Sequence, residues 1–310
     1  MCLRAATLVF CAGLLGGAQT PERLFEQALG HYTQQRPGEA EGLLREALKQ
    51  RPKWFQARFL LGAILVSLGR PAEAVQHLEA AHGLDPSHAD CAKLLAAEYL
   101  GLNRPAESLR VLRRLLRTPD EESLLLAIEA LHARNDAGDS GEAYQLGALG
   151  LKRYPDSARL LAWHGFALRE RGEFDEARRS LEAALQLAPD DLGTRGILGD
   201  VLRREGRLEE ALRVFDLVLT EDPADDEALI GKGRTLAAMG KTGEALRVMQ
   251  AAIRAAPQAA RLRLELSQLY ARLGDSEGAA REAAEFRRLR EAHGENRLPH
   301  GLRSVTGTQR

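Results

Sequence analysis

Residues 192–225 read LGTRGILGDVLRREGRLEEALRVFDLVLTEDPAD, and this stretch decides the fold. Apolar and small residues recur at helical spacing on both sides of Gly206. Glycine adopts the positive φ that ends a helix and reverses the chain, and Pro223 closes the stretch because proline cannot continue a helix. The stretch therefore predicts two helices with a turn at Gly206 between them.

The same pattern recurs along most of the chain. Glycine and alanine repeat with a period of 34 residues, for example at Gly172 and Gly206 and at Ala177 and Ala211. Small residues allow two helices to approach closely where they cross, and larger neighbours fill the space around the crossing. A single helix pair cannot bury its own apolar stripe, so the period predicts stacked pairs. Prolines mark the same period, with separations of 33 to 36 residues, at Pro52, Pro86, Pro119, Pro155, Pro189, Pro223 and Pro257.

This pattern resembles the tetratricopeptide repeat, a helix–turn–helix of about 34 residues. The resemblance implies an all-α fold, a right-handed superhelical α-solenoid of about eight repeats. One array is expected over residues 19–294, and its last helix, over residues 276–293, has the charged outer face of a terminal cap. The expected repeats lie near residues 21–54, 55–88, 89–122, 123–157, 158–191, 192–225, 226–259 and 260–294.

The fourth expected repeat departs most from the pattern. Leu131 stands where the other repeats have a small residue, and Gly147 and Gly150 replace a large and a small apolar residue. We expect a local change of superhelical pitch or a mobile seam over residues 123–151. Hydrogen exchange as slow there as in the fifth and sixth repeats would contradict this expectation.

Residues 1–18 have the three-part form of a secretory signal peptide. One arginine, Arg4, precedes an apolar run over residues 5–15, and small residues follow before a predicted cleavage after Ala18. We therefore expect an exported protein, either periplasmic or extracellular. An uncleaved N-terminal membrane anchor is the alternative, and lipidation of Cys11 is less favoured because a bulky residue precedes it.

The remaining composition argues against several classes of protein. The chain has 43 Lys and Arg against 44 Asp and Glu, which disfavours a nucleic-acid-binding surface. After the signal, no stretch approaches the roughly 20 apolar residues that span a membrane. Cys91 is then the only cysteine, so no internal disulfide is expected, and it is interpreted as a small apolar residue rather than a reactive thiol. Residues 295–310 lack a helical period and are expected to form a disordered tail.

The sequence contains no recognisable catalytic or metal-binding motif. None of the eight histidines belongs to an H-E-x-x-H or paired-cysteine arrangement. Gly231 and Gly233 lie inside a predicted helix rather than between a strand and a helix, so they do not form a phosphate loop. We expect no enzyme activity, no cofactor and no metal site.

In this family the first helix of each repeat lines a concave groove, and the resemblance carries that role onto particular residues. Aromatic residues early in the chain and arginines late in it suggest a protein or peptide partner with an apolar part and an acidic part. In the alternative interpretation, the aromatic residues pack against neighbouring helices and the arginines pair with local acidic residues. The candidate groove residues are Phe25, Leu29, Tyr32, Phe59, Val66, Arg169, Arg203 and Arg234. Further lining positions include Ala63, Lys93, His132, Asn135, Ala162, Phe166, Asp200, Leu264 and Gln268.

The favoured function is a non-enzymatic protein–protein interaction scaffold that binds peptide segments in this groove. An envelope assembly factor for secretion, pilus, outer-membrane or polysaccharide-export machinery is the alternative. The repeat part of a glycosyltransferase lacking its catalytic domain is a third option, which the short tail disfavours. The carboxylate clamp of chaperone-binding members is not expected, because its Lys and Asn positions here hold Phe25, Leu29 and Leu60. The oligomeric state stays open.

Overall fold

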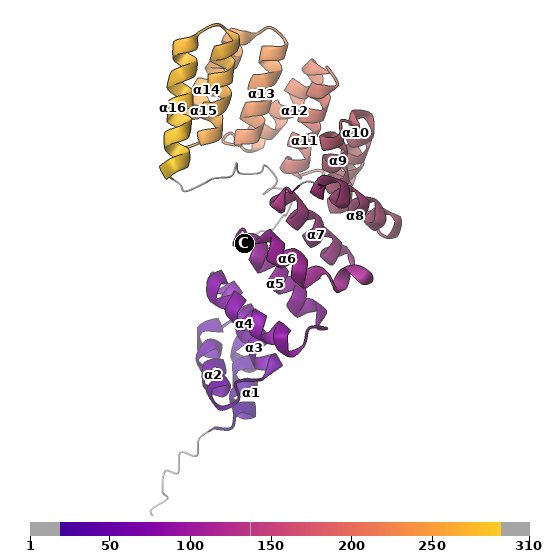
Figure 1. Ribbon diagram of the computed structural model, residues 1–310, viewed down its shortest axis with the longest axis vertical. Coiled ribbons are helices and arrows are strands. Elements are labelled where there is room, and N and C mark those ends of the chain that lie inside the picture. The colour runs from indigo at the N-terminus through magenta and orange to yellow at the C-terminus, as the bar shows by residue number, and fades with distance from the viewer. Residues whose placement is uncertain (1–18, 137, 293–310) are drawn as a thin grey trace, which may run out of the picture. The chain divides into compact units, whose positions relative to one another are not determined.

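The computed structural model describes residues 19–136 and 138–292, which form sixteen α-helices and one short 3-10 helix. No strand occurs within these two ranges, so the expected all-α repeat fold is confirmed (Figure 1). The expected signal peptide and C-terminal tail lie outside the described residues. The chain divides into two compact units, of which unit 1 ends at Arg104 and unit 2 begins at Pro105. This division falls between the two helices of the third expected repeat.

Unit 1 consists of two helix pairs and one further helix. Its helices pack in chain order, α1 on α2 and α3 on α4, while α3 also contacts α5. Proline occupies a first-turn position in α1, α2 and α4, where its fixed φ suits a helix and its missing N–H is not needed. The helices are α1 (Pro21–Thr33), α2 (Pro37–Gln50), α3 (Phe55–Ser67), α4 (Pro71–Leu84) and α5 (Ala89–Gly101).

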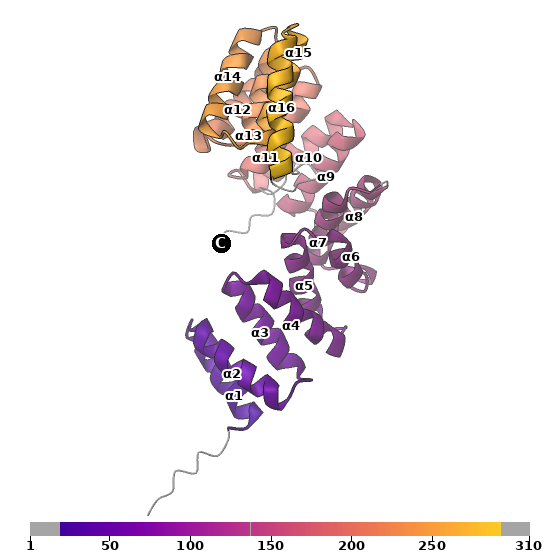
Figure 2. The same cartoon turned by 60° about the vertical axis from the view of Figure 1, so that its left-hand side comes forward.

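Unit 2 repeats the same antiparallel pairing over a longer stretch, from α6 to the terminal pair α15 and α16 (Figures 1 and 2). Contacts also join α7 to α9, α9 to α11, α11 to α13, and α13 to α15. We call this row of five first helices the first-helix face of unit 2. The helices are α6 (Pro105–Leu112), α7 (Glu121–Arg134), α8 (Asp139–Arg153), α9 (Ala158–Arg171), α10 (Phe174–Leu187), α11 (Leu192–Arg204), α12 (Leu208–Glu221), α13 (Asp226–Ala238), α14 (Thr242–Ala255), α15 (Ala260–Arg272) and α16 (Ser276–Ala292), with a 3-10 turn at Leu115–Arg117.

Local sequence signals begin and end these helices. Asp191 caps α11 by accepting a hydrogen bond from the Thr194 backbone N–H at 3.1 Å, and Asp225 caps α13 in the same way. Gly206 adopts a φ of 80° between α11 and α12, as the quoted stretch predicts. Asn103, which replaces the turn glycine in the third repeat, takes the same left-handed conformation with a φ of 57°. Asparagine tolerates this conformation better than most residues, so the reversal is kept.

The helices of one repeat cross at a small residue that faces a large one sixteen positions later. Gly62 faces Leu78, Gly165 faces Leu181 and Gly199 faces Phe215. A Cβ atom at Gly199 would lie 2.8 Å from the Phe215 ring, closer than real Cβ contacts allow. The ring would equally overlap a Cβ atom on Gly231 of the next first helix. Phe215 therefore fills a space that two successive repeats leave open.

The fourth repeat keeps this spacing but exchanges the two sizes. Leu131 of α7 is buried at the position of the small residue, and Gly147 of α8 stands sixteen residues later. Gly150 lies so close to its neighbours that a Cβ would come within 2.9 Å of Leu160 and 3.2 Å of Leu124. The missing bulk on α8 is thus supplied by large residues on α7 and α9. The mobility of this seam stays a prediction.

Adding a methyl group at the two glycines of α8 should have opposite effects. At Gly147 a Cβ would make an ordinary contact, 3.6 Å from His164, so Gly147→Ala should gain about 0.5–1 kcal/mol of stability from helix propensity. Gly150→Ala should lose about 1–2 kcal/mol, because Leu160 and Leu124 must give way. Urea unfolding of both variants checks the pair. Equal effects at the two positions would contradict this packing.

Candidate functional site

The predicted groove residues of unit 1 fall into two groups. Leu29 and Tyr32 are exposed on α1, at 44% and 37% respectively. Phe25 and Phe59 are half-buried, because Phe25 lies 4.9 Å from the Trp54 ring and Phe59 lies 5.2 Å from the His88 ring. Val66 on α3 is also half-buried. In unit 1, therefore, Leu29 and Tyr32 are the candidates most available to a partner.

In unit 2 the predicted arginines lie on the first-helix face. Arg203 of α11 donates to Asp200 of the same helix at 2.6 Å, and Arg204 donates to the other carboxylate oxygen at 3.0 Å. Arg169 of α9 reaches the same carboxylate from the preceding repeat, with 3.7 Å between the closest atoms. These four residues form what we call the arginine cluster.

Arg234 of α13 has a different environment. Its guanidinium donates to both carboxylate oxygens of Glu265 on α15, at 2.8 Å and 2.6 Å. The Glu265 side chain is only 7% exposed, so the ion pair between Arg234 and Glu265 is buried on the Glu265 side. Because Arg234 and Glu265 neutralise each other in a bidentate ion pair, Arg234 attracts a further acidic group only weakly. Arg234 thus joins two repeats rather than offering a free cation.

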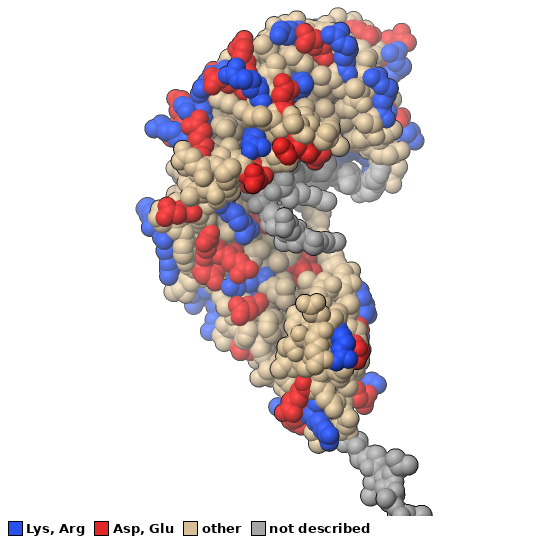
Figure 3. Space-filling view, turned by 180° about the vertical axis from the view of Figure 1, so that it is seen from behind, with Lys and Arg blue, Asp and Glu red and all other residues tan. Residues whose placement is uncertain are grey.

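The arginine cluster keeps an excess of positive charge. Burial raises the pKa of the Asp200 carboxyl, but Arg203, Arg169 and Arg204 outweigh this effect and hold the pKa below its ordinary value. Asp200 is therefore ionised at neutral pH. Arg169 also pairs with Glu170 at 2.8 Å, so three cations face two carboxylates. These five side chains together carry one net positive charge. On the face seen in Figure 3, basic and acidic residues lie interspersed over the described surface.

An Asp200→Asn variant should show this pKa in the pH dependence of stability. A carboxyl whose pKa is lower in the folded state stabilises the protein above its unfolded pKa, about 3.9, and loses that effect as the pH falls through the folded pKa. The variant should be about 1–2 kcal/mol less stable than the parent at pH 7, because asparagine still accepts hydrogen bonds. The difference should shrink below about pH 4. Thermal unfolding between pH 2.5 and 7 measures it, and a constant difference would contradict the assignment.

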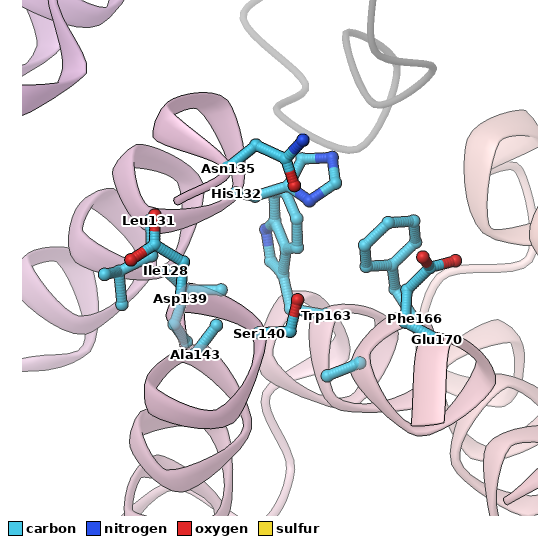
Figure 4. Close-up of a pocket in the computed structure, with 11 residues that line it drawn as sticks. Ile128, Leu131, His132, Asn135, Asp139, Ser140, Ala143, Trp163, Phe166 and Glu170 are labelled. Carbon is cyan, nitrogen blue, oxygen red and sulfur yellow. The ribbon is translucent and has the colours of Figure 1, made fainter. Parts of the chain in front are cut away.

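Next to the arginine cluster lies a small pocket of about 20 Å³ between α7, α8 and α9 (Figure 4). Three rings form one wall, with His132 edge-on to Phe166 at 4.6 Å and Trp163 edge-on to Phe166 at 5.8 Å. His132, Asn135 and Phe166, which the sequence placed on the groove, are thus brought together. The lining residues are Ile128, Leu131, His132, Asn135, Asp139, Ser140, Ala143, Trp163, Phe166, Ala167 and Glu170.

The irregular turn of the fourth repeat shapes this pocket. Asn135 ends α7 in the left-handed conformation, with a φ of 52°. Arg134 then donates to Asp139, the first residue of α8, with 3.0 Å between Nε and Oδ2. The backbone N–H of Asp136 donates to the same carboxylate at 2.7 Å. The arginine and this hydrogen bond hold the pKa of Asp139 below its ordinary value. The turn is therefore tied down beside the pocket.

Trp163 is the functional candidate that the sequence did not indicate. Its side chain is only 2% exposed, and its indole Nε1 has no hydrogen-bond acceptor among the described residues. Figure 4 shows the nitrogen edge of the indole turned toward the side of the pocket that carries Ile128, Leu131 and Asp139. Buried indole N–H groups usually have a partner, so this one is exceptional. Its position beside an irregular repeat is the signal that could have drawn attention to it.

The described residues give no support for a metal site, a membrane span or a reactive thiol. Within 19–136 and 138–292, no three His, Cys, Asp or Glu side chains are grouped to hold a metal ion. In the same ranges, no helix combines the length and apolar character needed to cross a membrane. Cys91 is buried, and burial raises the pKa of its thiol to about 11. A thiol with this pKa is mostly protonated at neutral pH and is a poor nucleophile.

Comparison with known proteins agrees with the helix pairing. A family model described as tetratricopeptide repeat matches residues 25–89, 164–226 and 230–293, and a second model of the same description matches residues 65–131. A tetratricopeptide repeat protein from Parabacteroides merdae is 18% identical, with 89% of this chain and 94% of that chain covered and a TM-score of 0.48. A double mutant of MamA RS-1 is 20% identical, with 61% and 96% covered and a TM-score of 0.43. Curated protein sequences give no significant match.

Proposed function

Because the chain belongs to the tetratricopeptide repeat family, whose members bind other proteins, we propose that it is a non-enzymatic scaffold for a segment of a partner protein. The segment lies on the first-helix face of unit 2. One observation carries this proposal: the arginine cluster, with its excess positive charge, adjoins the ring-lined pocket. Arg169 links the two, since its guanidinium lies 4.3 Å above the Phe166 ring and also faces Asp200.

These two features select the chemistry of the partner segment. Acidic side chains complement the excess charge of the arginine cluster, and arginine binds carboxylates with good geometry. An apolar group next to them suits the rings of His132, Trp163 and Phe166, which pack edge-on beside the arginine cluster. In unit 1, the exposed Leu29 and Tyr32 offer a separate apolar contact for a partner.

Removing the cluster's cations should weaken partner binding. An Arg169→Gln plus Arg203→Gln variant should bind an acidic partner segment at least tenfold more weakly, because charge-assisted hydrogen bonds are lost. Affinity capture with the chain lacking residues 1–18, from the envelope of the producing cell, identifies the partner, and its binding is then measured. Binding should also weaken as salt is raised.

A matched control variant carries the same number of substitutions elsewhere in unit 2. Arg179 of α10 and Arg281 of α16 form exposed ion pairs with Glu176 and Glu277 of their own helices, away from the first helices that carry the arginine cluster. Arg179→Gln plus Arg281→Gln should leave the affinity unchanged. If both double variants bind the partner as tightly as the parent chain does, the first-helix face is not the binding surface.

We also propose that the protein is exported and works outside the cytoplasm. The proposal rests on the charged, apolar and small-residue parts of residues 1–18. Mass spectrometry of the protein isolated from its own cell should find Gln19 as the first residue. A chain that still begins at Met1 would favour the membrane-anchor alternative, and a lipid on Cys11 would favour the lipoprotein alternative.

A further inference from the structure

We propose that an arginine-rich surface on α6 and the turn after it binds the phosphate groups of anionic phospholipids at a membrane surface. We call this surface the basic face and define it by Arg110, Arg113, Arg114 and Arg117. It lies on the second helix of its repeat, whereas the arginine cluster lies on first helices. The basic face is therefore a second site, separate from the one that holds the partner segment.

The four arginines of the basic face have no counter-charge in the protein. All four side chains are exposed, and within the described residues none of their guanidinium groups forms an ion pair or a hydrogen bond. The acidic residues that follow in sequence are engaged elsewhere. Asp120 accepts from the Ser123 backbone N–H at 2.8 Å, and Glu121 accepts from the Ser157 hydroxyl. The basic face therefore keeps the full charge of four cations for an external anion.

The end of α8 adds two further cations near the basic face. Arg153 Nη1 donates to the carbonyl oxygen of Pro119 at 3.2 Å, so its guanidinium lies at the end of the arginine-rich stretch. The preceding residue, Lys152, is exposed and has no ion pair within the part of the chain that the structure describes. From Ser108 to Pro119 the sequence contains no acidic residue. The surface thus carries charge of one sign.

The arginines also account for the short second helix of this repeat. α6 ends at Leu112 after eight residues, whereas α2, α4, α10, α12 and α14 each have fourteen. Arg113 and Arg114 follow this end, and a 3-10 turn covers Leu115–Arg117. Spacings of three, four and seven residues would put all four arginines on one side of a continuous helix, where like charges repel. An anion that neutralises the basic face should therefore let the helix continue toward Arg117.

The chemistry of the basic face suits phosphates on a lipid surface. Guanidinium groups bind phosphate oxygens in a bidentate geometry. Leu112 is fully buried, and Leu109 and Leu116 pack against the core, so the surface between the arginines offers little apolar area. The centre of a protein–protein interface is usually more apolar than this. A layer of lipid headgroups, by contrast, attracts a protein through its basic residues alone.

Nucleic acid also presents phosphates, and two observations favour lipid over it. Residues 1–18, whether cleaved or retained, direct the chain to a membrane. The chain has 43 Lys and Arg against 44 Asp and Glu, which is not the basic excess of a nucleic-acid-binding domain. The choice of lipid thus rests in part on the proposed export, whereas the phosphate chemistry of the basic face does not.

The test uses vesicles made of equal parts of phosphatidylglycerol and phosphatidylcholine, together with the chain lacking residues 1–18. That chain keeps every described helix and lacks the apolar run over residues 5–15, which would bind lipid by itself. It should float with these vesicles but not with pure phosphatidylcholine, and added salt should release it. Replacing all four arginines of the basic face by glutamine should weaken binding about a hundredfold or more, because each contributes about fivefold near an anionic surface.

A matched control removes the same number of charges from scattered positions. Arg247, Arg254, Arg272 and Arg287 are exposed on α14, α15 and α16 and, among the described residues, have no ion pair. Replacing these four by glutamine should change vesicle binding by no more than about twofold, because charges farther from the lipid than about 10 Å are screened. Equal losses in the two variants would mean that only the total charge matters, and would overturn the basic face as a site.

Hydrogen exchange of the parent chain tests the site without a substitution. The amides of residues 113–117 should exchange more slowly when anionic vesicles are present, because an extended helix protects them. Unchanged exchange in this stretch would overturn the lipid site. So would binding to a DNA duplex or to a glutamate-rich peptide without binding to the vesicles. These outcomes leave the first-helix face untouched, since Arg169→Gln plus Arg203→Gln tests partner binding there, and the first residue of the isolated protein tests export.

Discussion

A Phe215→Ala variant is expected to lose about 3–5 kcal/mol of unfolding free energy, the range for removing a buried aromatic side chain. Phe215 lies on α12 with 2% of its surface exposed. Its ring occupies the space left by Gly199 of α11 and Gly231 of α13, and neither glycine has a side chain that could refill it. A cavity between three helices should therefore remain, and the cost of such a cavity adds to the lost burial.

Urea unfolding followed by circular dichroism measures this loss. Leu217→Ala is the matched control, because Leu217 lies on the same helix and is 57% exposed. The control should change stability by less than about 0.5 kcal/mol. If Phe215→Ala costs less than about 1 kcal/mol, α11 and α13 close over the gap and the glycines do not define a rigid space.

The close approach of Gly231 to the Phe215 ring also predicts that a smaller residue at position 215 compensates for a larger one at position 231. Gly231→Ala places a methyl group in the Phe215 ring and should destabilise the protein, although alanine is the better helix former. Phe215→Leu removes the outer ring atoms that the methyl group meets. The double variant should therefore be more stable than the sum of the two single effects, and a double-mutant cycle measures this difference.

An Arg234→Met variant is expected to lose about 2–3 kcal/mol, because Glu265 is left as a buried charge without a partner. This figure lies below the usual range for a buried pair, since the Arg234 side chain is 37% exposed and water can still approach it. Arg234 was a groove candidate on the basis of its position in the repeat. Its bidentate contact with Glu265 predicts an effect on stability rather than on partner binding.

Replacing Glu265 as well should restore the stability that Arg234→Met loses. Arg234→Met plus Glu265→Leu removes both charges, and apolar replacement of a buried ion pair is often neutral. Thermal unfolding should place the double variant within about 1 kcal/mol of the parent chain. A single Arg234→Met variant as stable as the parent chain would mean that water or a neighbouring arginine already satisfies Glu265.

Much of the fold follows from local sequence signals. Asp191, Gly206 and Pro223 specify where two helices begin, turn and end, and each acts through residues within one turn of itself. The small and large residues of each crossing are also visible in the sequence because their spacing is constant. In the fourth repeat, however, Gly147 was interpreted as missing bulk. The exchange with Leu131 becomes visible only when both sides of the crossing are compared.

The candidate site was less predictable, because its contacts join different repeats. The period placed Arg169, Arg203 and Arg234 on one face, yet it could not tell which acidic residue each one meets. That choice depends on how far successive first helices are displaced from one another, which sets Asp200 between Arg169 and Arg203. The pocket depends on three helices and on the irregular turn after Asn135, so no single stretch of sequence encodes it.

The position of Phe215 has a consequence for dividing the chain into fragments. Phe215 belongs to the sixth repeat by sequence, but Gly231 of the seventh repeat covers one side of its ring. A fragment that stops at Pro223 would therefore expose that side of the ring to water. The buried residues from α7 to α13 form one continuous core cluster, which includes Leu181 on one side of Pro189 and Leu198 on the other. A cut at either of these two periodic prolines therefore divides a hydrophobic core.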